Sequence, residues 1–146
     1  MNEEQQQAFL AEPHIGVLSV ASGEGRPPLT IPLWYAYEPG GNLTFFTGTQ
    51  GRKARKTALI ERAGAISLCV QRAEFPYKYV TVEGTVIGTD RPPSRDGMLA
   101  IIRRYLPEEQ AQGFVAAELA QPSPTLVLFT IRPDRWLAAD FGDAAG

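Results

Sequence analysis

Four cationic side chains follow closely after two glycines near the middle of the chain. Gly48 and Gly51 permit a sharp exit from a preceding strand into a predicted helix. The cations in the first turn of that helix are Arg52, Lys53, Arg55 and Lys56. A helix N-terminus favours negative charge, so this cluster is unfavourable unless an anion binds there. The pattern indicates a phosphate site with charge-assisted hydrogen bonds, and the alternative is a solvated basic helix face.

The elements around this cluster predict a mainly β protein, an antiparallel six-stranded β-barrel with flanking α-helices. The predicted strands are Ile15 to Ala21, Leu29 to Tyr37, Leu43 to Thr47, Ile66 to Val70, a strand around Val80 to Val86, and Leu126 to Ile131. The predicted helices are one capped by Asn2 and ending near Ala11, the basic helix, and two at about 95–106 and 107–120. We expect the last two helices to cover the sheet.

Proline within the second predicted strand marks a place where pairing is incomplete. Pro32 has no backbone N–H, so the strand from Leu29 to Tyr37 must have an edge or a bulge there. Backbone groups left without a partner at that point are available to a ligand.

Length and composition indicate a single domain over residues 1–146 and exclude several classes of protein. The chain has 146 residues, a formal net charge of -2 and a pI near 5.4, which argue against a dedicated nucleic-acid-binding protein. No apolar run reaches the roughly 20 residues of a spanning helix, and the N-terminal segment lacks the apolar centre of a signal peptide. We therefore expect a cytoplasmic protein without a membrane partner. Cys69 is the only cysteine, so an internal disulfide is impossible, and its place inside Ile66 to Val70 indicates a packed thiol rather than a nucleophile.

Side chains that could carry out catalysis by themselves are scarce. His14 is the only histidine and follows Pro13 in a predicted turn, so neither a Ser-His-Asp triad nor a multi-histidine metal site is expected. No metal ligand set and no catalytic residue can be assigned. A protein of this kind can still perform redox chemistry if a bound cofactor carries the reactive atom.

Several segments together resemble the pyridoxamine 5'-phosphate oxidase-like flavoproteins, which are FMN-binding split β-barrels. The counterparts of the family's motifs are Phe46-Thr47, Gly51-Arg52-Lys53, Ile66 to Val70 and Val82-Glu83-Gly84. The resemblance extends from Ile15 to Gly142, and the order and spacing of the motifs make it specific. It implies that the barrel is split.

The resemblance also implies the positions of a cofactor site. The flavin ring would lie along Leu29, Thr30, Ile31 and Pro32, and the phosphate would lie at Thr47, Gly48, Arg52 and Lys53. A second subunit would complete the site. Lys78 and Tyr79 replace an Arg-Gln pair of the oxidases, which argues against pyridoxamine phosphate as substrate. Trp136 stands where relatives contribute an aromatic residue across the dimer, and its alternative role is to anchor the end of the last strand.

Two cofactors remain open on this basis. FMN ends in a compact phosphate and is expected first, whereas the deazaflavin coenzyme F-420 needs a longer cationic groove, which Arg55, Lys56 and Lys78 could supply. We expect a flavin-dependent oxidoreductase that transfers hydride to or from a small molecule. The alternatives are a non-catalytic flavin- or haem-binding module and a barrel that has lost its ligand.

A homodimer is expected from both the resemblance and the aromatic content. A single core cannot cover all the aromatic side chains on the predicted sheet, and exposed aromatic patches usually mark an interface. These side chains are Trp34, Tyr35, Tyr37, Tyr77 and Tyr79.

Overall fold

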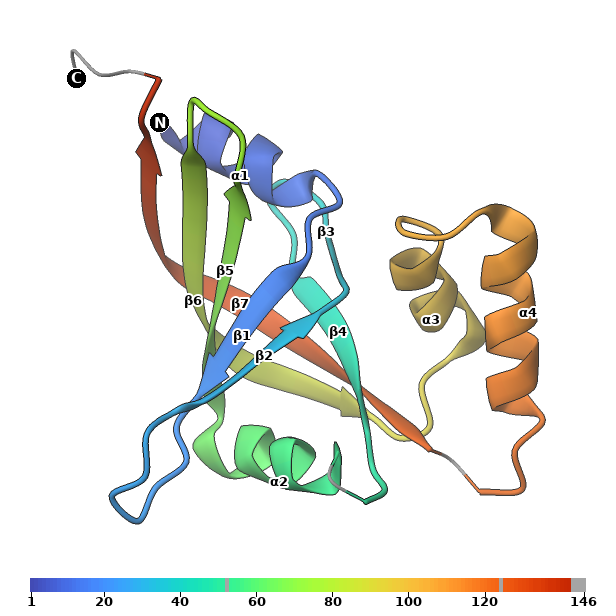
Figure 1. Cartoon of the computed structure of the whole chain (residues 1–146). Coiled ribbons are helices and arrows are strands. Elements are labelled where there is room, and N and C mark those ends of the chain that lie inside the picture. The colour runs from blue at the N-terminus through green and yellow to red at the C-terminus, as the bar shows by residue number, and fades with distance from the viewer. Residues whose placement is uncertain (52, 124, 143–146) are drawn as a thin grey trace.

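The computed structural model describes residues 1–51, 53–123 and 125–142, and of Lys53 it describes only the backbone. The strands are β1 (Gly16–Val20), β2 (Leu29–Leu33), β3 (Tyr35–Tyr37), β4 (Leu43–Gly48), β5 (Ala65–Arg72), β6 (Lys78–Asp90) and β7 (Leu126–Asp140). The helices are α1 (Glu3–Ala11), α2 (Lys53–Ala63), α3 (Arg95–Ile102) and α4 (Glu108–Leu119). All strand pairs are antiparallel, and the sheet curls into a barrel with α1 and α2 at opposite ends (Figure 1). The predicted mainly β fold with flanking helices is confirmed.

The described sheet has seven strands instead of the six predicted because the segment from Leu29 to Tyr37 is divided at Trp34. Its order is β2-β1-β5-β6-β7-β4-β3, so β2 forms one edge and β3 forms the other. Trp34 is the one residue between β2 and β3, so it connects the two edge strands covalently. No hydrogen-bonded ladder links β2 to β4 in the described sheet, and the barrel is therefore split between these two strands.

One face of each strand fills the interior of the barrel. On β5, Ile66, Leu68 and Val70 are buried, while the intervening residues are more exposed. On β6, Val80 and Val82 continue the same pattern. The two-residue alternation predicted for both strands is confirmed.

The aromatic side chains are divided between this core and the surface. The expectation that Tyr35 and Tyr37 need an interface to cover them is wrong, because both side chains point into the core and are buried. Trp34 is half-buried against the core of the α3–α4 hairpin. Tyr77 and Tyr79 remain exposed, and only these two still support a subunit interface.

The N-terminal helix forms as predicted. The side chain of Asn2 accepts a hydrogen bond from the Gln5 backbone N–H at 2.8 Å, and the Gln5 side chain accepts one from the Asn2 N–H at 2.8 Å. This reciprocal capping box satisfies two backbone donors at the start of α1. Phe9 and Leu10 are buried against the barrel.

The last strand is longer than the predicted Leu126 to Ile131, because it continues through Pro133 to Asp140. A register shift against β6 lies at this point: Glu83 pairs with Arg135, whereas Gly84 pairs with Pro133. Such a bulge tolerates a proline that a regular ladder would exclude.

Gly84 is required at this bulge by close backbone approach. A Cβ atom at Gly84 would lie 2.4 Å from Cγ2 of Ile131 and 2.7 Å from the backbone oxygen of Arg132. Gly84→Ala is therefore expected to lower the free energy of unfolding by about 1–3 kcal/mol, the usual cost of overpacking. Gly113→Ala on α4 is the control, because nothing lies within 4 Å of its Cβ position and alanine should stabilise that helix by about 0.5–1 kcal/mol. Urea denaturation of both variants checks the prediction, and equal stabilities would contradict it.

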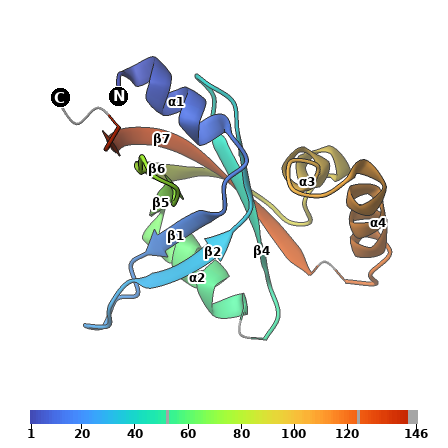
Figure 2. The same ribbon diagram turned by 45° about the horizontal axis from the view of Figure 1, so that its top comes forward.

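The helices α3 and α4 form a hairpin beside the barrel and do not spread over the sheet (Figure 2). They pack mainly on each other through a small core that includes Met98, Ile102 and Val115. Trp34 and Phe46, from the barrel, pack against this core. The hairpin therefore covers the neighbourhood of β3, β4 and the start of β7, which contributes Leu126 to this core. In the described ranges, no helix combines the length and apolar character that a membrane span requires.

Candidate functional site

The free edge of β2 is the first component of the candidate site. Within the described sheet β2 has a ladder only with β1, in which Pro32 lies opposite Val17. A proline is tolerated there because its missing N–H faces away from the neighbouring strand. By the alternation of an antiparallel strand, the backbone N–H and C=O of Thr30 face the same free side. The predicted edge at Pro32 is confirmed.

The end of β4 is the second component. β3 covers β4 only from Leu43 to Phe45, so Phe46 to Gly48 have no strand on that side in the described sheet. Both ribbon views show the end of β2 approaching β4, and the two strands diverge toward α2 (Figures 1 and 2). The split thus has on both sides a strand edge without a neighbouring strand, and it lies beside the start of α2.

The loop from β4 to α2 is held in a defined conformation. Its Thr49 N–H donates to the backbone oxygen of Thr125 at 3.0 Å, and the Ala54 N–H donates to the Gly51 oxygen at 3.2 Å. Gly51 has a φ of 61°, a left-handed conformation that favours glycine. Arg52 lies outside the described residues, and so does the side chain of Lys53, so their predicted contact with a phosphate stays a prediction. Arg55 is exposed on the first turn.

Thr47 and Thr57 connect the end of β4 to the second turn of α2. Their hydroxyl oxygens lie 2.6 Å apart, and the Thr57 hydroxyl donates to the Gly48 backbone oxygen at 2.7 Å. A hydroxyl carries one hydrogen, so the Thr47 hydroxyl must donate to Thr57. Only 3% of Thr47 is exposed, and its side chain therefore braces the loop. Thr57 was not found from the sequence, because a lone threonine inside a helix gives no distinctive signal.

The residues predicted along the flavin ring divide between the two faces of β2. Leu29 and Ile31 are half-buried and pack against the barrel core. Thr30 and Pro32 are exposed on the outer face, where the Thr30 hydroxyl lies 3.3 Å from that of Ser19. The outer face of β2 therefore offers a small polar side chain and a proline ring next to the free edge.

The remaining predicted residues lie elsewhere in the same chain. Lys78 pairs with Asp140 at 3.5 Å, and Tyr79 is exposed on the outer face of β6, three strands from β2. Trp136 packs against the core and makes an edge contact with Tyr37, with ring centroids 5.8 Å apart. Since strands are about 4.8 Å apart, Tyr79 is about 14 Å from β2. One chain alone does not bring these residues to the split.

Tyr105, just after α3, braces the bend between β2 and β3, a role that the sequence did not indicate. Its hydroxyl accepts from the Tyr35 N–H at 3.2 Å and lies 2.7 Å from the His14 backbone oxygen, to which it donates. Its ring stacks on Trp34, with centroids 5.0 Å apart and an angle of 6°. Burial raises the pKa of Tyr105 above its ordinary value, so the hydroxyl stays a neutral donor.

His14 serves the same part of the fold. Its Nε2 lies 2.9 Å from the Phe9 backbone oxygen, and its ring packs 4.4 Å from that of Phe9. These contacts hold the end of α1 against the barrel and give the imidazole a structural role.

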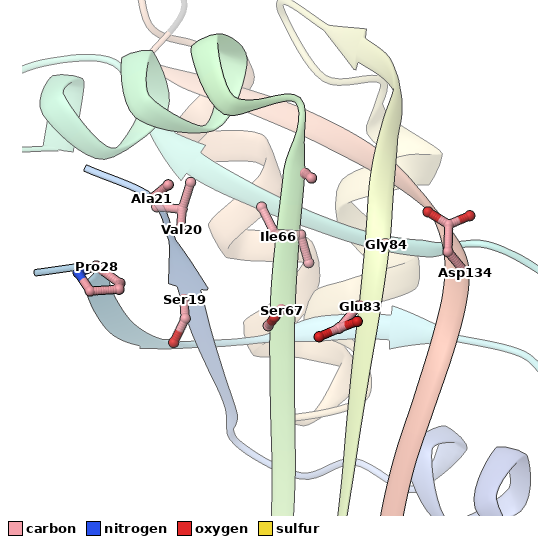
Figure 3. A pocket seen from close by; sticks show the side chains of 10 residues that line it. Ser19, Val20, Ala21, Pro28, Ile66, Ser67, Glu83, Gly84 and Asp134 are labelled. Atoms are coloured by element: carbon pink, nitrogen blue, oxygen red, sulfur yellow. The ribbon is translucent and has the colours of Figure 1, made fainter. Parts of the chain in front are cut away.

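A shallow groove of about 400 Å³ crosses the outer face of β1, β5 and β6. Figure 3 shows Ser19, Ser67 and Glu83 on neighbouring strands of its floor and Asp134 at its rim. Its described lining contains carboxylates and no lysine or arginine, so it does not suit an anion. The groove is therefore distinct from the split between β2 and β4.

The comparison with family models identifies the chain's relatives directly. The family model described as "Pyridoxamine 5'-phosphate oxidase" matches residues 2–139. A comparison with curated proteins found no match.

Solved structures share the fold at low sequence identity. An F420 reductase is 23% identical, with a TM-score of 0.66 and coverage of 90% of this chain and 94% of that one. A conserved hypothetical protein from Mycobacterium tuberculosis is 16% identical, with a TM-score of 0.72 and coverage of 100% and 89%. A FAD-binding protein from Mesorhizobium loti is 20% identical, with a TM-score of 0.60 and coverage of 94% and 92%. With the family model matching nearly its whole length, the chain belongs to the pyridoxamine 5'-phosphate oxidase family.

Proposed function

We propose that this protein binds FMN or coenzyme F-420 in the split between β2 and β4 and acts as an oxidoreductase on a small molecule. The observation that carries the proposal is the pair of edges without a neighbouring strand, at Thr30 and Pro32 on β2 and at Phe46 to Gly48 on β4, beside the start of α2. Membership of the family supports a flavin-type cofactor, and the names of two structural neighbours refer to F420 and FAD. When bound, the cofactor supplies the atom that accepts or donates the hydride.

The chain itself would bind and orient the cofactor. Backbone groups on the free edge of β2 are suited to hydrogen bonds with a polar ring edge, because unpaired backbone donors and acceptors need partners. Arg52, Lys53 and the loop from Gly48 to Gly51 would hold the phosphate. The left-handed Gly51 keeps that loop free of a side chain at its turn.

FMN is the first candidate because the cationic cluster is compact. A longer F-420 tail would need further cations, and Lys78, one of those predicted, is paired with Asp140 away from the split of its own chain. The absence of the oxidases' Arg-Gln pair at Lys78 and Tyr79 makes pyridoxamine phosphate an unsuitable substrate.

We also propose a homodimer in which the outer faces of two sheets meet. Exposed apolar side chains on this face lie on β1, β6 and β7 and include Val17, Tyr79 and Leu137. Val17 pairs with Cys69, Cys69 with Thr81, and Thr81 with Leu137, so they form one row across the sheet. Exposed apolar side chains gathered on one face of a sheet are typical of an interface, and a second copy would also supply Tyr79 to the partner's split.

Titration with the two cofactors tests the binding proposal. FMN and F-420 are added in turn to the purified protein, and absorbance and fluorescence are followed. We expect at least one of the two cofactors to bind saturably, with one cofactor per chain. FMN is expected to bind more tightly than F-420. Failure of both cofactors to bind would overturn the proposal.

A non-catalytic binding module is the second candidate, because His14, the only histidine, is held by α1 and is not a free acid or base. Reoxidation of the photoreduced, bound cofactor by added two-electron acceptors separates the two functions. If the protein is an oxidoreductase, at least one acceptor should reoxidise the bound reduced cofactor faster than it reoxidises the free reduced cofactor. Uniformly slower reoxidation would favour a module that only binds.

A further inference from the structure

We propose that Thr57 is a positioning residue for the phosphate end of the cofactor, an inference that rests on the proposed function. Thr57 lies on the buried side of the second turn of α2 and touches the loop that precedes the helix. Its hydroxyl accepts from Thr47 at 2.6 Å and donates to the Gly48 oxygen at 2.7 Å. The same hydroxyl therefore fixes the helix to the last two residues of β4.

This contact sets the position of the first turn of α2 relative to the strand. Two described main-chain hydrogen bonds of the loop reach Thr125 and the start of the helix, through the N–H groups of Thr49 and Ala54. The Thr57 hydroxyl joins α2 directly to β4, through Thr47 and Gly48. Without them, the helix start is free to shift from the end of β4, and a cation displaced by even 1 Å loses its alignment with an anion.

The burial of the pair makes the link specific to hydroxyl groups. Thr47 is 3% exposed and Thr57 is 4% exposed, so water does not readily replace either hydroxyl. If the Thr57 hydroxyl is removed, the Thr47 hydroxyl and the Gly48 oxygen both lose their partner inside the protein. The loop must then move to satisfy them, and the loop is the element that would hold the phosphate.

A comparison of FMN with riboflavin isolates this effect, because riboflavin has the same ring without the phosphate. We expect the isosteric Thr57→Val variant to bind FMN about 5- to 10-fold more weakly than wild type, as loss of about one hydrogen bond predicts. Its affinity for riboflavin should stay within about twofold. Thr57→Ser keeps the hydroxyl and should retain the wild-type preference for FMN.

Thr85→Val is the matched control. The Thr85 hydroxyl donates to Asp134 on the outer face, and its removal should change neither affinity. If Thr57→Val does not fold, Thr57→Ala replaces it, because alanine keeps the helix favourable. Failure of both variants to fold would show that the hydroxyl serves folding and would overturn the proposal.

The remaining outcomes separate this proposal from the proposed function. If wild type binds FMN more tightly than riboflavin but Thr57→Val keeps the full preference, the positioning role is overturned and the phosphate site stands. An equal loss of FMN and riboflavin would also overturn it, since the effect would not act through the phosphate. If wild type shows no preference for FMN, the phosphate site itself falls, and with it this proposal. If F-420 is the cofactor that binds, the same comparison is made between F-420 and the deazaflavin that lacks the phosphodiester tail.

Discussion

Replacement of Arg52 by alanine is expected to weaken FMN binding by about 10- to 150-fold, because a charge-assisted hydrogen bond contributes about 1.5–3 kcal/mol. Arg52 lies between the left-handed Gly51 and Lys53, the first residue of α2, where the sequence gathers cations against the helix dipole. The fold should remain, because the loop is held by Thr57 and by backbone hydrogen bonds. Isothermal titration calorimetry measures the FMN affinity, and thermal melting shows whether the variant keeps its fold.

Arg62 provides the control on the same helix. It lies in the last turn of α2, where a cation complements the dipole, and Arg62→Ala should leave FMN affinity unchanged. Added salt should weaken wild-type binding more than binding by the Arg52 variant, because the lost contribution is electrostatic. Equal affinities for wild type, Arg52→Ala, Lys53→Ala and Arg62→Ala would mean that the basic cluster is only a solvated helix face.

The second large effect is expected from Leu137→Asp on the outer face of β7. If two sheets meet there, the variant buries an unpaired carboxylate, which costs about 3–5 kcal/mol and should weaken dimerisation more than about 100-fold. FMN binding should fall with it, because a shared site needs both chains. Sedimentation velocity and FMN titration at the same protein concentration check the prediction.

Leu119→Asp is the matched control for that experiment. Leu119 ends α4 on the helical hairpin and is 50% exposed, close to the 42% of Leu137. The same change of leucine to aspartate there should leave the dimer and the affinity intact. A Leu137→Asp protein that remains dimeric would show that the interface lies on another surface.

Local sequence rules predicted most of the strands because each rule concerns neighbouring residues. The alternation in β5, the edge position of Pro32 and the cap at Asn2 all follow from local sterics and hydrogen bonding. The division at Trp34 was not predictable in this way. It arises because β2 and β3 pair with different strands, β1 and β4, and that choice is made by the whole sheet.

Contacts between distant segments explain what the sequence did not reveal. β7 passes through Pro133 because Gly84, far away in the chain, lets the two strands approach at a bulge. The role of Trp136 could not be decided from the sequence, because its side chain could lie on either face of the last strand. In the structure it packs beside Tyr37. The bracing role of Tyr105 depends on the bend at Trp34, which sequence reasoning had not found.

The sequence motifs indicated the chemical character of the candidate site, but they did not indicate where in the fold the site lies. Gly48, Gly51 and the cations gave the loop its chemical character, while the free edges of β2 and β4 became visible only with the strand order. The sequence also gave no means of judging that Lys78 and Tyr79 lie away from the split of their own chain. The proposed shared site between two chains would resolve this separation.

Light scattering combined with cofactor absorbance tests that shared site most directly. The protein is passed through a sizing column after incubation with FMN, and F-420 is used in a parallel run. We predict a peak of twice the 15.9 kDa chain mass that carries one cofactor per chain. A monomer that retains its cofactor, or a dimer that retains neither cofactor, would contradict the account.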